Sequence, residues 1–310
     1  MRENSAAQYS DDEIDLRELW NIVWSERLLI VIVTAIFALA SIVYALIQTD
    51  IYRAEAVLAP AEAGQSGSPL ANQLGGAAAL VGINIGSQGD GRIGTALAIM
   101  RSREFIRRFV AEHDAAVPLF AGTWDSSTGE SGIDSAIYDV ETNEWVNRNS
   151  PPSDLQVFRQ LSGILEINQE NTTGLVRVAI RWHDPAQASE WVNQLVQDIN
   201  RDIKEADIEE ANNAIRYLQQ QLETTQLVDM QRVFYQLIES QTRITMLADV
   251  RDEYVFQVID PAVVPDQKVA PRRSLIVIVG TLAGGFLTVL FVFLRNAIKS
   301  SGTPRTRDTL

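Results

Sequence analysis

The 310-residue sequence contains no cysteine and only two histidines, His113 and His183. The absence of thiols excludes a disulfide framework, a thiolate zinc site, an iron–sulfur cluster and a cysteine nucleophile. Two imidazoles offer little for metal binding or acid–base catalysis. The sequence also lacks the GxxxxGK[ST], GxSxG and HExxH patterns of phosphate cradles, hydrolases and metalloproteases. We therefore predict a protein that is not an enzyme and that needs no cofactor or metal.

Basic residues are in the minority. The chain has 26 Lys and Arg against 40 Asp and Glu, which gives a formal charge of -14. A surface that binds nucleic acid normally shows clustered Lys and Arg, so the charge argues against a nucleic-acid partner. Residues 49–273 hold 32 acidic and 19 basic residues, so nearly all of the net negative charge belongs to the middle of the chain.

Two segments, residues 28–47 and 274–294, contain no charged residue. As helices, each would cross the roughly 30 Å hydrocarbon core of a bilayer. A cleaved signal peptide is the alternative for the first, but the apolar run is too long and the preceding tail is acidic. A buried core helix is the alternative for the second, but core helices rarely stay apolar on every face. We predict transmembrane helices at 28–48 and 274–294.

The cations beside the spans predict the orientation. The sides facing the two chain ends carry Arg17, Arg27, Arg295, Lys299, Arg305 and Arg307, and the opposite sides carry Arg53, Lys268, Arg272 and Arg273. The positive-inside bias is modest and places tails 1–27 and 295–310 in the cytoplasm. Residues 49–273 then lie outside, and we predict a multi-pass protein of the bacterial inner membrane with a periplasmic domain.

The first tail contains a capping-box pattern at Ser10, Asp11, Asp12 and Glu13, followed by apolar residues at helical spacing as far as Trp24. This pattern predicts a short amphipathic helix at the membrane surface. A continuation of the first transmembrane helix is an equally compatible reading.

The middle segment combines strand and helix signals. Residues 51–58 and 254–259 predict strands that pair near the membrane, because both chain ends leave the bilayer at one surface. Residues 176–182 alternate apolar and polar side chains after a turn at 171–174, which predicts a hairpin with a strand around Leu165 and Ile167. Apolar spacing predicts a helix over 93–113. Residues 59–94 and 114–152 are typical of loops, with 71–83 able to form a short helix.

The strongest local signal begins at Asp184 and Pro185, an N-cap followed by proline at the first helical position. No Gly or Pro occurs from residue 186 to residue 260. We predict a long helix at about 185–223, a turn at Thr224 and Thr225, and a second helix at about 228–248. A helix longer than its own core leaves part of its apolar stripe for neighbouring copies.

Two groups of residues are candidates for contact with other molecules. The second span contains Gly280, Gly284 and Gly285 in a GxxxG pattern, which permits close helix packing in a membrane, and Pro261, Pro265 and Pro271 precede it. We predict that this glycine face packs against a neighbour or a partner. Arg101, Arg103, Arg107 and Arg108 form a basic group that suits a glycan or lipid phosphate, with salt bridges along the helix face as the commoner alternative.

The motifs occur in the order found in one known family. They are EIDLRELW at 13–20, Tyr52-Arg53-Ala54, Met100-Arg101-Ser102-Arg103, Asp184-Pro185 with Asn193 beyond it, and the Pro-rich segment before Gly280 and Gly284. In this order and within the two-span frame, the chain resembles the polysaccharide co-polymerases, the Wzz-type chain-length determinants. The sixteen residues after Leu294 contain no Walker motif, which indicates a member outside the tyrosine-kinase branch.

The resemblance implies a membrane-proximal α/β base, an extended helical arm and a ring-shaped homo-oligomer. It also implies control of O-antigen chain length in lipopolysaccharide biosynthesis, together with a Wzy-type polymerase that acts on undecaprenyl-diphosphate-linked glycan. Two alternatives remain open at this point. One is a co-polymerase for capsule or exopolysaccharide export that works with an ABC transporter, and the other is a two-span periplasmic sensor.

Overall fold

The computed structural model describes residues 20, 23–61, 88–125, 128–146 and 151–301. It forms two compact units, which are considered separately. The helical unit contains the described parts of Met1–Thr49 and Ala270–Leu310, and the α+β unit is Asp50–Val269. Two apolar helices and an α+β domain with a long helix are the fold class that the sequence predicted.

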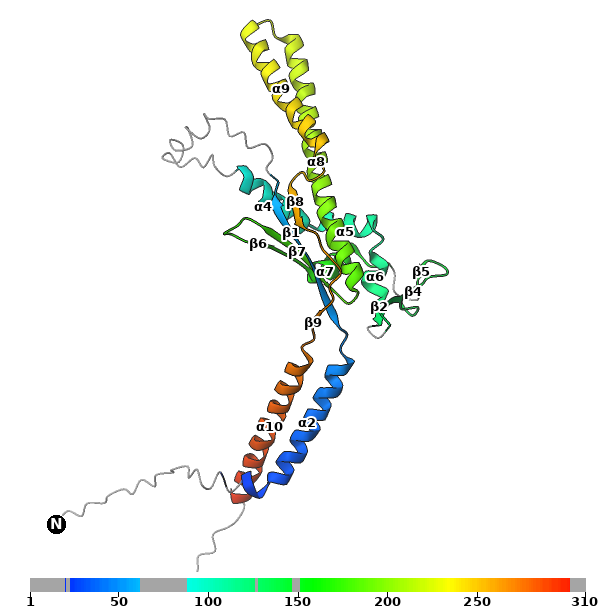
Figure 1. Ribbon diagram of the computed structural model, residues 1–310, viewed down its shortest axis with the longest axis vertical. Helices are drawn as coiled ribbons and strands as arrows, with labels where there is room; N and C mark the ends of the chain where they lie inside the picture. Colours follow the sequence, from blue (N-terminus) through cyan, green and yellow to red (C-terminus); the bar gives the residue numbers. More distant parts are fainter. Residues whose placement is uncertain (1–19, 21–22, 62–87, 126–127, 147–150, 302–310) are drawn as a thin grey trace, which may run out of the picture. The chain divides into compact units, whose positions relative to one another are not determined.

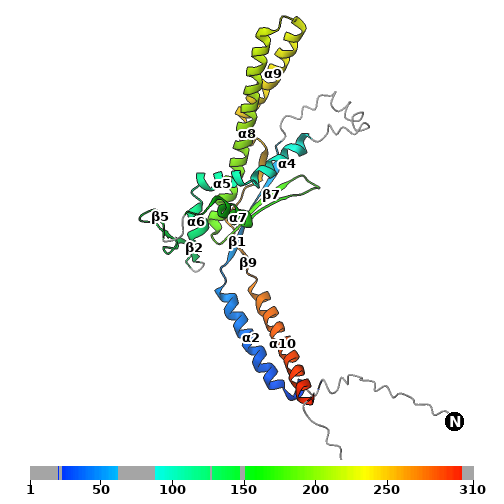
Figure 2. The ribbon, with the colours of Figure 1, turned by 180° about the vertical axis from the view of Figure 1, so that it is seen from behind.

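The helical unit consists of α2 (Arg27–Ile47) and α10 (Arg273–Ser301), which lie side by side (Figure 2). Residues Arg27–Ile47 and Arg273–Asn296 are long and apolar enough to cross a membrane. Near one end of the pair, the rings of Trp20 and Trp24 stack with centroids 5.9 Å apart, and Arg295 lies 3.6 Å from Glu26. Most of the amphipathic helix predicted for the tail lies outside the described residues.

The α+β unit is built on one antiparallel sheet. Its order is β6 (Leu165–Gln169), β7 (Val176–Trp182), β1 (Ile51–Pro60) and β8 (Phe256–Asp260), and β9 (Lys268–Ala270) also pairs with β1. Leu58 lies opposite Val258, so the predicted pairing of the first and last strands is confirmed. The predicted β6–β7 hairpin is confirmed as well, with Ile167 opposite Val178.

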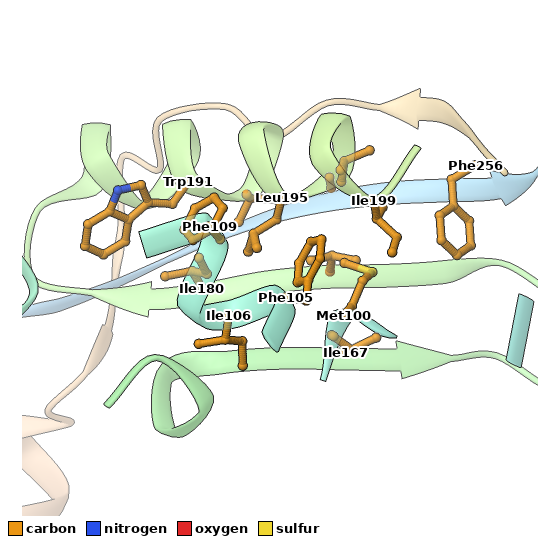
Figure 3. Packing of buried hydrophobic residues seen from close by; sticks show 14 of the residues in the cluster. Met100, Phe105, Ile106, Phe109, Ile167, Ile180, Trp191, Leu195, Ile199 and Phe256 are labelled. Carbon is orange, nitrogen blue, oxygen red and sulfur yellow. The ribbon is translucent and has the colours of Figure 1, made fainter. Parts of the chain in front are cut away.

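Helices cover one face of this sheet and enclose the core (Figure 3). They are α4 (Gln88–Met100), α5 (Arg103–Glu112), α7 (Asp154–Ile164) and the first half of α8 (Pro185–Thr224). Leu195 and Ile199 of α8 meet Phe105 and Phe109 of α5, and all four are buried. Complete burial of each such side chain stabilises the fold by about 1.5–3 kcal/mol.

The long helix α8 has the start that its sequence predicted. The Asp184 carboxylate accepts hydrogen bonds from the backbone N–H groups of Ala186 and Gln187, at 2.9 and 3.1 Å. The helix runs for 40 residues, about 60 Å, and α9 (Val228–Val250) returns beside it (Figure 1). The last buried residue of α8 is Ala211, so the distal part of the hairpin extends beyond the core.

Two asparagines on α8 bind the chain that leads back toward α10. Asn200, which is buried, accepts hydrogen bonds from the N–H groups of Val255 and Phe256 and donates one to the carbonyl of Phe256. Asn193 makes a reciprocal pair with the backbone of Ala262, at 2.9 and 3.0 Å. The two asparagines are seven residues apart and therefore lie on one helix face. They attach the start of β8 and the segment after it to α8.

Two expectations for the segment before α7 were wrong. The helix expected over 93–113 is divided into α4 and α5, because Ser102 adopts an extended backbone and caps α5 by accepting from the N–H of Phe105. The region 114–152, expected to be loop, contains α6 (Ala116–Ala121) and two small hairpins. Their strands are β2 (Gly122–Asp125) with β3 (Glu130–Ile133), and β4 (Tyr138–Asp139) with β5 (Glu144–Trp145). α6 forms because its short apolar run buries Leu119 and Ala121.

The hydrogen bonds of Asn200 give the first testable prediction. Asn200→Ala leaves three buried backbone groups without partners, so we expect the free energy of unfolding to fall by about 3 kcal/mol. The control is Asn212→Ala, at an exposed position of the same helix. Pulse proteolysis of the full-length chain in detergent and urea would measure the effect. Equal urea midpoints for the two variants would contradict the assignment.

Candidate functional site

The glycine face of α10 lies against α2 of the same chain. A Cβ atom added at Gly280 would lie 2.9 Å from Cβ of Ser41, and one added at Gly284 would lie 2.5 Å from Cγ of Phe37. Both distances are too short for real carbon contacts, so the two helices approach closely because these positions lack side chains. At Gly285 the nearest atom, in Thr34, would be 3.6 Å away, which is ordinary contact.

This packing restricts the contact with a neighbour or a partner that was predicted for the glycine face of α10. Gly280 and Gly284 can meet another chain only if α2 is displaced, because Ser41 and Phe37 already fill the space beside them. The sequence indicated the close approach but not its partner, since Ser41 and Phe37 carry no motif of their own. Apolar side chains on other faces of the pair, such as Leu39 and Leu282, are exposed within the part of the chain that the structure describes.

The three prolines before α10 lie in a segment that is attached at both ends. Pro261 follows β8 directly, and the next residue is the one that Asn193 binds. Pro265 lies in the irregular chain before β9, and Pro271 follows it with a cis peptide bond. Between these prolines, the ammonium of Lys268 lies 3.0 Å from both carboxylate oxygens of the buried Asp50. This ion pair connects the segment to the start of β1.

Each of the four arginines in the predicted basic group has a partner within the chain. Arg101 donates to the backbone carbonyl of Ile167 at 2.7 Å, and Arg107 pairs with Glu104 on the same helix. Arg108 pairs with Asp202 of α8, and the guanidinium of Arg103 lies 5.7 Å from the ring centroid of Phe158 in α7. The four side chains therefore diverge toward different elements and do not gather into one patch. Their contact with a glycan or lipid phosphate stays a prediction.

A charged cluster that the sequence did not reveal joins α5 to α8. The ligand atoms of Glu112, His113 and Asp198 lie within 4.8 Å of one another, a spacing that would suit a metal ion. The guanidinium of Arg201, however, bonds to both carboxylates, at 2.7 Å to Glu112 and 2.9 Å to Asp198. Because a cation already fills the space between the carboxylates, the cluster is an ion-pair network and does not fit a metal. No local sequence pattern predicts this cluster, because His113 and Asp198 are 85 residues apart.

Charged side chains also line the face of the sheet opposite the core. Arg53 lies directly across from Arg181, an unfavourable pair that Glu166 relieves by bonding to both, at 3.0 and 2.7 Å. Burial alone would raise the pKa of Glu55, but hydrogen bonds and charge from Arg177 and Arg53 lower it below its usual value. Each of the three arginines, Arg53, Arg177 and Arg181, therefore has a carboxylate partner within the chain, in Glu55 or Glu166.

The second histidine, His183, lies at the corner between β7 and α8. Its ring centroid is 4.2 Å from that of Trp182. Burial lowers the pKa of His183, and the neighbouring carboxylate of Asp184 offsets part of this effect. Among the described residues, no further acid, base or nucleophile accompanies it in a cleft, so its contacts are those of packing.

Comparison with known proteins finds two family models that match this chain, over ranges that include all of the motifs except Asp184-Pro185 with Asn193. Residues 12–113 match the family model described as Wzz, chain length determinant protein, and residues 218–297 match GNVR, described as "G-rich domain on putative tyrosine kinase". Residues 12–113 thus resemble chain length determinant proteins, and the predicted resemblance to the Wzz-type chain-length determinants is confirmed. No curated protein matches the sequence.

Solved structures of two such proteins resemble this chain. A full-length bacterial polysaccharide co-polymerase is 14% identical, with 94% of this chain and 100% of that chain covered and a TM-score of 0.43. A fragment of WzzB, a polysaccharide co-polymerase from Salmonella Typhimurium, is 15% identical, with 72% and 100% covered and a TM-score of 0.29. The resemblance to the chain-length determinants therefore rests on the two matches to family models.

The packing of Gly284 gives the second prediction. In this cysteine-free chain, the double variant Thr34→Cys/Gly285→Cys places two thiols in contact, and we expect an intramolecular disulfide on oxidation. Adding Gly284→Leu should separate α10 from α2 and lower the disulfide yield by about fivefold. The yield is measured by blocking free thiols with a polyethylene-glycol maleimide before electrophoresis. The control, Ala283→Leu, enlarges an exposed neighbour and should leave the yield unchanged; an equal loss in both variants would refute the packing.

Proposed function

We propose that this chain is a non-enzymatic regulator of surface polysaccharide length in the bacterial inner membrane. It would act as an oligomeric scaffold beside a Wzy-type polymerase that extends undecaprenyl-diphosphate-linked O-antigen. The observation that carries the proposal is the match of residues 12–113 to the chain length determinant model, in a chain with a helix long enough to cross a membrane at each end of its α+β unit.

The structure supports a scaffold because its polar clusters are used in packing. Arg101, the arginines of α5, the Glu112–His113–Asp198 cluster and the charged sheet face all have partners within the chain. Long helices that extend beyond the core are suited to contacts between subunits. A ring of identical chains would place many copies of the hairpin around one growing polymer.

Both tails would lie in the cytoplasm and the α+β unit in the periplasm. In this arrangement α2 and α10 act as one packed pair, which Gly280 and Gly284 hold together. We propose that an outer face of this pair, together with the segment that contains Pro261, Pro265 and Pro271, contacts the polymerase. The acidic periplasmic unit would not capture an anionic polymer by charge alone.

Deletion of the gene tests the function. We expect the modal length distribution of surface polysaccharide, resolved on a gel, to be replaced by a distribution without a preferred length. Restoring the gene should restore the mode. An unchanged distribution after deletion would reject the proposal, and loss of all surface polysaccharide would favour a role in export.

The orientation is tested by single cysteines in the cysteine-free chain. Thr242→Cys on α9 should react with a membrane-impermeant maleimide in spheroplasts, because α9 would face the periplasm. Ser301→Cys at the end of α10 should react only after lysis. The opposite pattern would reverse the proposed orientation.

A further inference from the structure

One end of the α2–α10 pair carries two exposed tryptophan rings beside an arginine. Trp20 and Trp24 are 65% and 57% exposed, and their rings stack with centroids 5.9 Å apart. The guanidinium of Arg27 lies 5.2 Å from the ring centroid of Trp24, which is a cation–π distance. A guanidinium held over a ring face keeps the N–H donors in its own plane available for an anion.

Arg27 has no carboxylate partner among the residues that the structure describes, where the ring of Trp24 is the one polar or aromatic contact of its guanidinium. Glu26 is the only acidic residue in the described part of the helical unit, and its carboxylate lies 3.6 Å from Arg295 of α10. The first turn of α2 contains no acidic residue, and the Glu26 side chain makes no capping hydrogen bond to it. The helix start carries partial positive charge, so it and the guanidinium beside it both lack a capping anion.

The charge of the helical unit contrasts with that of the whole chain. Its described residues contain one acidic residue and five basic ones, whereas the chain has a formal charge of -14. Like charges repel, so the acidic remainder of the chain is not attracted to an anionic lipid surface. Attraction to such a surface is therefore confined to the ends of the helix pair.

The position of Arg27 corresponds to the depth of lipid headgroups. The uncharged run begins at the next residue, and the 21 residues of α2 extend about 31 Å, which matches the thickness of the hydrocarbon core. Tryptophan is enriched at this boundary because its ring is apolar and its N–H is polar. Phospholipid is what an exposed side chain meets at this depth, and its phosphate accepts paired hydrogen bonds from arginine. The lipid therefore supplies the anion that Arg27 lacks.

We propose that Trp24 and Arg27 form a binding site for the phosphate of an anionic phospholipid headgroup. Arg27 donates to the phosphate oxygens, Trp24 positions the guanidinium, and Trp20 extends the ring surface. The site differs from a diffuse positive surface because one oriented guanidinium provides the selectivity. The inference requires only that the helix pair lies in a membrane, so it stands or falls independently of the control of polysaccharide length.

Native mass spectrometry of the full-length chain in detergent tests the role of Arg27. Phosphatidylglycerol is added stepwise, and the dissociation constant of the first lipid adduct is measured. Arg27→Gln should raise this constant about tenfold, because a charge-assisted hydrogen bond is lost. The matched control, Arg272→Gln, removes the same charge from an exposed arginine at the other end of the pair and should change the constant by less than about twofold. Equal changes in the two variants would indicate diffuse attraction and overturn the proposal, as would an unchanged constant in Arg27→Gln.

The ring and the headgroup are tested in the same titration. Trp24→Leu keeps an apolar side chain but removes the ring, and should raise the constant about threefold. The control Tyr44→Leu removes an exposed ring near the opposite end of α2 and should have no effect. Phosphatidylcholine, whose phosphate is balanced by choline, should bind the wild-type chain about fivefold more weakly than phosphatidylglycerol. Equal affinity for the two lipids, or equal effects of the two ring variants, would reject the site. Circular dichroism verifies that each variant retains its helices.

Discussion

The α+β unit depends on the burial of one face of α8 against the five-stranded sheet. Trp191, Leu195 and Ile199 fill the space between the sheet and α5, and Asp184 fixes where this face begins. Three further attachments use the same helix. Asn193 and Asn200 hold the returning chain, and Asp198 bonds to groups at the end of α5. Because these residues share one rigid helix, the elements they bind are fixed relative to one another.

Because α8 is so long, only its proximal part contributes to the core. Its distal part, beyond Ala211, contributes no buried residue. Beyond Ala211 its only extensive partner in the described chain is α9, and Ala248 is the one fully buried residue of α9. A two-helix hairpin without a third element cannot bury two apolar faces. Apolar side chains of α9 that remain exposed, such as Tyr235 and Met246, are the consequence.

Packing of the membrane helices follows a different rule. No water drives apolar residues together in a bilayer, so close backbone approach replaces burial as the source of affinity. Gly280 and Gly284 provide that approach, with Ser41 and Phe37 as partners. Within the α+β unit, the Lys268–Asp50 ion pair joins the segment that precedes α10 to the start of β1.

Several elements were predictable from the sequence because their signals act over a few residues. The two apolar runs, the Asp184–Pro185 start of α8 and the turn between β6 and β7 belong to this group, as does the close-packing glycine pattern. Two further capping signals of the same local kind were present in the sequence but were not used in the predictions. Ser153 and Gln156 form a capping box that starts α7, and Ser102 ends the continuity of the helix expected over 93–113.

The contacts of the candidate site could not be predicted, because they join residues that are distant in sequence. Arg101 bonds to Ile167, 66 positions away, and Asn200 bonds to Phe256, 56 positions away. The basic group was visible in the sequence, but its dispersal among different partners was not. The sequence by itself determined the two spans, the long helix and the lack of a catalytic motif, since periodicity, capping and composition are local properties. Only the tertiary structure decided which charges are satisfied, which helix fills the glycine face and which apolar side chains of α9 stay exposed, because these depend on how segments distant in sequence pack against one another.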